Sequence, residues 1–225
     1  MKVSIIVPTK NEEKNIKEIL DKAKKFGEEI LVVDGHSTDK TPDIVQATGV
    51  KLIEDQGLGK GEALRRAIKE TSADIMVFID ADGSHNSEDI PKLIEPIKDN
   101  QADLVIASRR TGGSDELYGD LNKFFRELGS NIITLLINHH FKTAVTDSQN
   151  GFRAIKASLA KELDLKENIT TIEQEMLIKV LRKGGRVTEI PSHENKRKYG
   201  CSVIKLSKVW WRYIYSCLKY LYFYS

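Results

Sequence analysis

Short apolar runs alternate with longer amphipathic segments through the first half of this 225-residue chain. The runs have the length and apolar character of buried strands; they lie at residues 3–7, 30–33, 51–54, 75–79 and 104–107. The amphipathic segments have helical spacing and lie at residues 12–26, 41–48, 60–71 and 87–98. Strands joined by helices of this length need right-handed crossovers. The sequence therefore predicts an α/β fold with a mostly parallel central sheet flanked by helices.

The alternation stops near residue 110. Gly112 and Gly113 open a loop, and residues 121–141 are predicted to form one long helix with an apolar stretch at 132–137. That stretch is more apolar than the surface helices of most soluble domains, so the helix either packs in the core or faces lipid. We treat residues 121–141 as a candidate membrane-interface helix within a domain that covers residues 1–204.

The C-terminal segment differs from the rest of the chain in composition. From Asn195 to Ser225 there are seven Lys or Arg, no Asp or Glu, six of the seven tyrosines and both tryptophans. Lys208, Arg212 and Lys219 recur at intervals of four and seven, which places them along one side of a helix. Residues 205–225 are therefore predicted to form a basic, aromatic, amphipathic helix at a membrane surface. Docking on the domain, or a homo-oligomer interface, are the alternatives.

Charge and cysteine content limit the compartment and the partners. The chain has 35 basic and 33 acidic residues, a balance that gives no sign of a nucleic-acid partner. Cys201 and Cys217 lack the spacing of a zinc site, and the N-terminus lacks the features of a signal peptide. No run of about 18 apolar residues is present to span a bilayer. We expect a peripheral protein on the cytoplasmic face of a membrane.

Two carboxylates, Asp80 and Asp82, directly follow the apolar run at residues 75–79. The carboxyl ends of strands are where open α/β sheets bind ligands. Like charges this close repel each other, and a hard divalent cation between them removes the repulsion. The pair is therefore a candidate Mg²⁺ or Mn²⁺ site, although an acidic turn with Gly83 in the left-handed conformation would give the same pattern.

Polar residues also follow the first two predicted strands. Pro8, Thr9 and Glu12 come after the first, and Asp34 comes after the second. Helix capping or turn formation explains each of them separately. Because the ends of parallel strands meet at one edge, we expect these residues to lie close to Asp80 and Asp82.

The chain resembles the inverting nucleotide-sugar glycosyltransferases of family 2, and within them the dolichyl-phosphate mannose synthase-like branch. The segments that carry the resemblance occur in the order of that family between residues 3 and 202: VSIIVPTKNEEKNI, VVDGHSTDKT, GLGKGEALRRAI, FIDADGSH, ASRR, TDSQNGFRAI, VTEIP and KRKYGCS. The resemblance implies a GT-A fold, with residues 1–204 as the catalytic domain, and a divalent-metal-dependent enzyme.

The resemblance also implies roles for particular residues. Pro8, Thr9, Glu12 and Asp34 would surround the base and ribose of a nucleotide-sugar donor. The Asp80-Ala81-Asp82 motif would hold the cation that bridges the diphosphate, which makes Asp82 a catalytic residue. Arg197 and Ser202 would reach the donor phosphates or sugar. Ser84 departs from the pattern, because many relatives have a glutamine there as a further metal ligand.

On the acceptor side the resemblance implies a polyprenyl phosphate, such as dolichyl phosphate. A phosphomonoester with a second pKa of about 6 is mostly dianionic at neutral pH, so it needs positioning rather than a strong base. Arg109, Arg126 and Ser130 would hold this phosphate, with Arg126 as a catalytic residue. An ordinary exposed helix face is the alternative for Arg126 and Ser130.

Several functions stay open at this point. GDP-mannose, UDP-glucose and UDP-N-acetylglucosamine are all suitable donors, and another glycan or lipid acceptor is an alternative to a polyprenyl phosphate. A non-catalytic, membrane-associated nucleotide-sugar-binding protein would explain the C-terminal segment but not the acidic strand ends. Nucleotide-sugar pyrophosphorylases begin with a glycine-rich loop, which this chain lacks. Haloacid-dehalogenase-type phosphatases have their Asp-x-Asp after the first strand, whereas here it follows the fourth.

Overall fold

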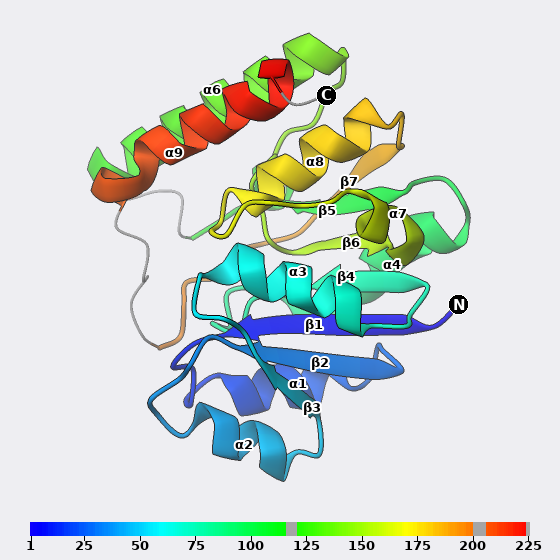
Figure 1. Ribbon diagram of the computed structural model, residues 1–225, viewed down its shortest axis with the longest axis vertical. Coiled ribbons are helices and arrows are strands. Elements are labelled where there is room, and N and C mark those ends of the chain that lie inside the picture. The colour runs from blue at the N-terminus through cyan, green and yellow to red at the C-terminus, as the bar shows by residue number, and fades with distance from the viewer. Residues whose placement is uncertain (116–120, 200–205, 224–225) are drawn as a thin grey trace.

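A computed structural model describes residues 1–115, 121–199 and 206–223. Within these ranges seven strands form one sheet, in the order β3-β2-β1-β4-β6-β5-β7. The strands are β1 (Val3–Thr9), β2 (Glu29–Asp34), β3 (Lys51–Glu54), β4 (Ile75–Phe78), β5 (Leu104–Ser108), β6 (Arg153–Lys156) and β7 (Val187–Pro191). The α/β fold with a flanked sheet is confirmed (Figure 1).

The helices cover both faces of the sheet. They are α1 (Ile16–Ala23), α2 (Thr41–Ala47), α3 (Lys60–Glu70), α4 (Ile90–Lys98), α5 (Arg109–Gly112), α6 (Leu121–Phe141), α7 (Ala157–Glu162), α8 (Ile172–Arg182) and α9 (Leu206–Leu218). A 3₁₀ turn, η1 (Ser87–Asp89), precedes α4, and a π turn, η2 (Lys219–Phe223), continues α9. The first predicted helix is shorter than expected, because residues 12–15 form a turn in which the amides of Asn15 and Ile16 both donate to the carbonyl of Glu12.

Strand β6 departs from the parallel pattern. It lies between β4 and β5 and runs antiparallel to both, while the pairs β1–β2, β1–β4, β2–β3 and β5–β7 are parallel. The sequence analysis predicted no strand at this position. β6 is only four residues long and follows the loop that ends in Gly151 and Phe152, so it lacks the long apolar run that identified the other central strands.

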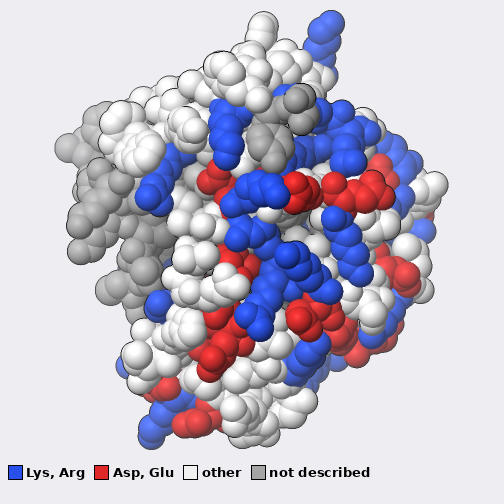
Figure 2. All heavy atoms as spheres, in the orientation of Figure 1, with Lys and Arg blue, Asp and Glu red and all other residues white. Residues whose placement is uncertain are grey.

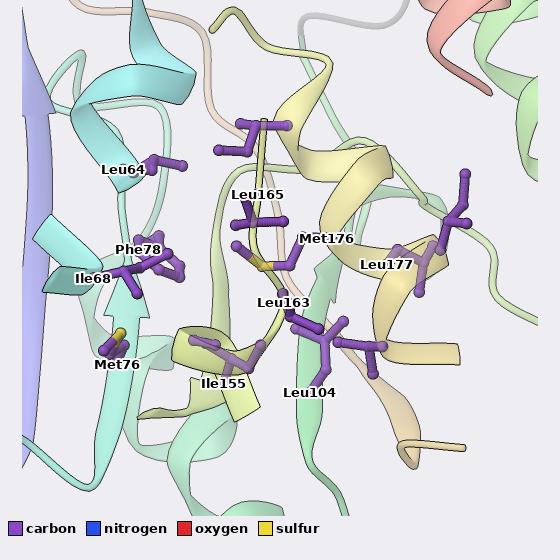
Figure 3. Packing of buried hydrophobic residues seen from close by; sticks show 14 of the residues in the cluster. Leu64, Ile68, Met76, Phe78, Leu104, Ile155, Leu163, Leu165, Met176 and Leu177 are labelled. Carbon is purple, nitrogen blue, oxygen red and sulfur yellow. The ribbon is translucent and has the colours of Figure 1, made fainter. Parts of the chain in front are cut away.

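Side chains that alternate along each strand build one core on either face of the sheet. On one face, Leu31, Met76 and Phe78 pack with α3, α7 and α8; Figure 3 shows the β4 side chains of this core beside Ile68 of α3. On the other face, Ile5 and Val77 pack with α1, α2 and α4. Because both faces are covered, the middles of β2 and β4 are apolar, and the predicted site residues lie at strand ends or just after them.

Helices α6 and α9 lie side by side at one end of the molecule (Figure 1). One side of the C-terminal segment is docked on the domain: Cys217, Tyr220 and Leu221 are buried, and Arg182 Nη2 donates to the carbonyls of Tyr220 and Leu221 at 2.7 and 3.1 Å. The other side is exposed. None of the described helices is long and apolar enough to cross a bilayer. The predicted boundary after residue 204 falls outside the described residues.

Two glycines in helices should respond oppositely to substitution by alanine. A Cβ on Gly61 would lie 2.4 Å from the carbonyl oxygen of Glu167, a backbone atom, whereas a Cβ on Gly129 in α6 would meet nothing within 4 Å. We expect Gly61→Ala to lower the free energy of unfolding by about 2 kcal/mol through overpacking. Gly129→Ala should raise it by about 0.5 kcal/mol, because alanine restricts the unfolded chain. Urea unfolding of both variants checks this, and equal shifts in one direction would contradict it.

Candidate active site

The ends of three neighbouring strands bring the predicted polar residues together. β1 lies between β2 and β4, and Thr9 of β1 is directly opposite Asp34 of β2 in the parallel register. Asp80 follows the end of β4 by two residues, on the other side of β1. The three positions therefore share one edge of the sheet, as the parallel arrangement predicts.

The β1 and β2 ends carry polar atoms that are not used within the protein. Thr9 Oγ1 and Asn15 Oδ1 are buried and have no hydrogen-bond partner in the part of the chain that the structure describes. Asp34 is also buried; its two oxygens accept from the Ser37 amide at 2.8 Å and the Ser37 hydroxyl at 2.6 Å. Because buried polar atoms are normally paired, Thr9 and Asn15 indicate a polar ligand at this edge.

Glu12 and its neighbours complete this side of the site. Glu12 accepts from Asn15 Nδ2 at 2.7 Å, and partial burial raises the pKa of its carboxyl group. Pro8 is half-buried, and Ala81 is buried in the core. His36 is exposed, and its Nε2 donates to the carbonyl oxygen of Asp55 at 3.0 Å.

Asp80 is held by a lysine that the sequence analysis did not single out. Lys60 Nζ, in the first turn of α3, lies 2.6 Å from Asp80 Oδ1 and 2.9 Å from Glu173 Oε1 of α8. Burial alone would raise the pKa of Asp80, but the positive charge of Lys60 outweighs it and holds that pKa well below its usual range. Burial alone would lower the pKa of Lys60, but the negative charges of Asp80 and Glu173 outweigh it and raise that pKa. Both side chains are therefore charged at neutral pH.

The turn before β6 leaves room for this ion cluster. A Cβ on Gly151 would lie 2.5 Å from Lys60 Nζ and 3.0 Å from Asp80 Oδ2. His85 Nε2 lies 3.8 Å from the same Asp80 oxygen. Arg153, also buried, donates to the carbonyl of Glu173 at 2.7 Å, and burial lowers the pKa of its guanidinium to about 10. Side chains from β4, α3, α8 and β6 thus meet around one carboxylate.

Asp82 is paired with a different positively charged side chain of the protein. Arg197 Nη2, from the loop after β7, lies 2.7 Å from Asp82 Oδ2, and Arg197 Nη1 lies 3.4 Å from Glu12 Oε1. The amide and hydroxyl of Ser84 donate to Asp82 Oδ1 at 3.0 and 2.7 Å. Ser84 therefore orients Asp82 in this structure. In this structure, each acid of the pair is neutralised by a cation of the protein itself.

The donor set at this site suits a hard divalent cation that also binds substrate oxygens. Among the described residues, no group of three or more His, Cys, Asp or Glu side chains is placed to hold a metal alone. Mg²⁺ usually binds one or two carboxylates together with substrate phosphates and water, and two carboxylates are present here. The guanidinium of Arg197 already places a positive charge beside Oδ2 of Asp82, as a bound metal ion would. The residues therefore fit the cation.

The predicted acceptor residues are only partly described. Arg109 is bound to Asp147, with Nε 2.6 Å from Oδ2 and Nη2 2.9 Å from Oδ1, and Arg109 Nη1 lies 3.4 Å from Glu194 Oε1. Its guanidinium is thus engaged within the protein, and its role toward an acceptor stays a prediction. Ser130 is half-buried in α6. The side chain of Arg126 and the whole of Ser202 lie outside the described residues.

Comparison with known proteins gives consistent matches. A family model described as "Glycosyl transferase family 2" matches residues 4–164. The chain is 34% identical to a dolichol-phosphate mannosyltransferase of Pyrococcus furiosus, over 98% of this chain but only 64% of that protein. It is 31% identical to a UDP-N-acetylglucosamine–dolichyl-phosphate N-acetylglucosaminyltransferase of Methanococcus voltae, over 72% of each chain.

Solved structures share the fold. A glucosyl-3-phosphoglycerate synthase of Mycobacterium tuberculosis, crystallised with Mn²⁺, UDP and glucosyl-3-phosphoglycerate, superposes with a TM-score of 0.77 over 98% of this chain and 80% of that one. The identity is 22%, so this similarity shows the fold alone. It confirms the GT-A architecture predicted for the chain.

Removing the lysine should destabilise the protein strongly. In Lys60→Met, the half-buried carboxylate of Asp80 and the buried carboxylate of Glu173 lose their shared cation, which should cost about 3 kcal/mol of unfolding free energy. Lys17→Met is the control, since its pair with Asp21 is exposed and should contribute less than about 1 kcal/mol.

Chemical denaturation at pH 7 measures both effects. The double variant Lys60→Met/Glu173→Gln should recover part of the loss, because one unpaired buried charge is removed. A Lys60→Met effect as small as that of Lys17→Met would show that this cluster does not hold the site together.

Proposed function

Because this chain belongs to glycosyl transferase family 2, we propose that it transfers a sugar from a nucleotide-diphosphate sugar to dolichyl or another polyprenyl phosphate, with inversion at the anomeric carbon. The observation that carries this proposal is the placement of Asp80 and Asp82 beside the unpaired polar atoms of Thr9 and Asn15, at one edge of the sheet. The names of both dolichyl-phosphate-dependent relatives support the acceptor.

The donor nucleotide would lie across the ends of β1 and β2. Pro8, Thr9, Glu12 and Asp34 line this part of the edge, where carboxylates accept from ribose hydroxyls or base N–H groups. The two relatives are named for different sugars, mannose and N-acetylglucosamine. GDP-mannose, UDP-glucose and UDP-N-acetylglucosamine therefore all enter the proposal as donors.

Asp82, together with Asp80, would hold Mg²⁺ or Mn²⁺. Bound there, the cation would neutralise the charge that develops on the departing nucleotide diphosphate. Lys60 already holds Oδ1 of Asp80, and Arg197 holds Oδ2 of Asp82. Ser84 keeps Asp82 in place through two hydrogen bonds, and Arg197 and Ser202 would contact the donor phosphates or sugar.

The acceptor phosphate would approach along α6. Arg126 and Ser130 are four residues apart in this helix and therefore share one side of it. Arg109 at the start of α5 joins them in the proposal, although it also binds Asp147 and Glu194. A polyprenyl phosphate dianion is already a nucleophile, so the task of these residues is to hold it in line with the anomeric carbon.

We also propose that α6 and α9 contact the membrane that holds the acceptor, on its cytoplasmic face. Large apolar side chains are exposed on both helices: Leu128, Ile132 and Leu135 on α6, and Trp210, Trp211, Ile214, Tyr215 and Leu218 on α9. In Figure 2 uncharged side chains gather at the top left of the visible face, whereas basic and acidic side chains are interleaved over its centre. An exposed aromatic surface of this kind suits the headgroup boundary.

A panel of radiolabelled nucleotide sugars and short polyprenyl phosphates tests the proposed reaction. One donor should give a lipid-linked sugar in the presence of Mg²⁺ or Mn²⁺, and a chelator should stop the reaction. Asp82→Asn should abolish transfer while the protein stays folded, because an amide does not supply the charge that the cation needs. Activity of Asp82→Asn within a few-fold of wild type would contradict the metal assignment. Transfer only to soluble acceptors would contradict the lipid assignment.

The acceptor role of Arg126 can be separated from the donor site. Arg126→Ala should weaken use of the acceptor by about tenfold or more, since a lost charge-assisted contact costs roughly 1.5–3 kcal/mol. Nucleotide affinity, measured by calorimetry with UDP and GDP, should stay unchanged. Equal losses in both measurements would count against the role.

Membrane contact can be tested without disturbing the buried side of α9. Leu135 and Trp211 are 67% and 50% exposed, so replacing both with glutamate should leave the fold intact and reduce co-sedimentation with vesicles that contain anionic lipid. Leu58→Glu is the matched control, because Leu58 is 50% exposed but lies in the loop before α3. If the wild-type chain does not sediment with lipid, the exposed surface serves another partner, such as a second copy of the chain.

A further inference from the structure

We propose that Arg197 is a built-in counter-ion of Asp82 that the divalent cation must displace, so that cation binding and release of the loop carrying Arg197 are one event. This loop, residues 192–199 after β7, is called the strap below. The inference deepens the proposed function, on which the identity of the cation site rests. It is carried by the contacts that the strap makes on both sides of the acidic pair.

The strap makes several hydrogen bonds over residues 192–196 and an ion pair at Lys198. Near its start, the Glu194 amide donates to the carbonyl of Gly113 at 3.0 Å, and the Asn195 amide donates to the carbonyl of Ser84 at 2.8 Å. Near its end, Lys198 Nζ lies 2.7 Å from the carboxylate of Glu18 in α1. The strap therefore crosses from the α5 side of the site to the α1 side. Arg197 is located between the attachments, at the acids themselves.

Arg197 occupies the oxygen of Asp82 that Ser84 does not hold. Ser84 holds Oδ1 from the amide and the hydroxyl, while Oδ2 faces Arg197 Nη2 at 2.7 Å. A divalent cation bound to Oδ2 would meet the positive guanidinium at contact distance, and the two would repel each other. One of them has to leave, so the cation and Arg197 compete for Asp82.

Asp80, the other acid of the pair, has a counter-ion that is fixed by the fold. Lys60 is fixed in the first turn of α3 and is shared by the two carboxylates of Asp80 and Glu173, one of which is buried in α8. Arg197, in contrast, comes from a loop, and its second contact, with Glu12, is longer at 3.4 Å. The structure thus pairs one acid with a fixed cation and the other with an exchangeable one.

A displaced Arg197 has a new partner when the donor is present. A guanidinium binds phosphate in the same two-pronged geometry as carboxylate. Release from Asp82 would therefore let Arg197 bind a nucleotide diphosphate that arrives with the cation. The proposal predicts opposite signs for two affinities: Arg197 opposes the cation alone and favours the cation together with the nucleotide diphosphate.

Mn²⁺ binding to the full chain tests directly whether Arg197 opposes binding of the cation alone. Electron paramagnetic resonance of free Mn²⁺ gives the affinity of wild type, Arg197→Ala and the control Lys196→Ala, which removes an exposed positive side chain of the same strap. Arg197→Ala should bind Mn²⁺ alone about two- to tenfold more tightly, since it loses a competitor held by a partly exposed ion pair. Lys196→Ala should match wild type. Weaker or unchanged Mn²⁺ binding by Arg197→Ala would overturn the proposal.

The second predicted effect, that Arg197 favours the cation together with a nucleotide diphosphate, is measured as the affinity of the same three proteins for UDP or GDP in the presence of Mn²⁺. The nucleotide that wild type binds should bind Arg197→Ala more weakly, despite its tighter hold on Mn²⁺. Equal or tighter nucleotide binding by Arg197→Ala would overturn the exchange of partners. None of these binding measurements depends on sugar transfer, so a failed donor or acceptor assignment leaves their outcome unaffected.

Hydrogen exchange of the strap provides a test in which Arg197 is not altered. Mn²⁺ should speed exchange of the strap amides in wild type. In Asp82→Asn these amides should exchange faster than in wild type without Mn²⁺ and should respond less to it, because the ion pair that helps to hold the strap is already lost. Slow, wild-type-like exchange of the strap in Asp82→Asn would show that Asp82 does not hold it, and would overturn the proposal.

Discussion

The shared contact of Lys60 with Asp80 and Glu173 is the interaction on which the site depends. It joins the end of β4 to the starts of α3 and α8, which are separated by more than a hundred residues along the chain. A buried carboxylate without a partner would be costly, and the pair of carboxylates would be more so. Because Lys60 removes that cost, the chain after β4 can place Asp82 two residues further on, at the open edge of the sheet.

The remaining parts of the site follow from the same edge. Thr9 and Asn15 keep unpaired polar atoms where β1 ends, and Asp82 exposes one oxygen that only Arg197 occupies among the residues described. The helices α6 and α9, which present the exposed apolar side chains, pack on the core face shared by α3 and α8. The donor edge and the apolar surface are thus built on one rigid sheet, which suits transfer of a soluble sugar to an acceptor held in lipid.

The sequence was informative where a local pattern determines structure. The alternation of apolar runs and amphipathic segments predicted five strands, and the parallel arrangement predicted that their ends would meet. β6 and β7 were missed because neither contains a long apolar run. The start of α1 was placed too early, because the turn at residues 12–15 is held by long-range contacts such as that of the Glu12 amide with Thr41 Oγ1. No periodicity in a sequence reports such a contact.

The site was predictable to the same extent. The acids after β1, β2 and β4 were visible, but the cations that neutralise them were not, because the pairing of Lys60 with Glu173 and of Arg197 with Asp82 depends on the tertiary fold. Arg109 had been assigned to the acceptor, and its pairing with Asp147 and Glu194 was equally invisible. The C-terminal helix was expected either to dock or to face a membrane, whereas one side is docked and the other is exposed.

A crystal structure with Mn²⁺ and a nucleotide diphosphate tests the central claim, that one acid has a fixed counter-ion and the other an exchangeable one. The account predicts that Mn²⁺ binds Asp82, that Arg197 has left Asp82 for the diphosphate, and that Lys60 still contacts Asp80 and Glu173. A structure in which Arg197 stays on Asp82 beside the metal, or in which Lys60 has left Asp80, would contradict it.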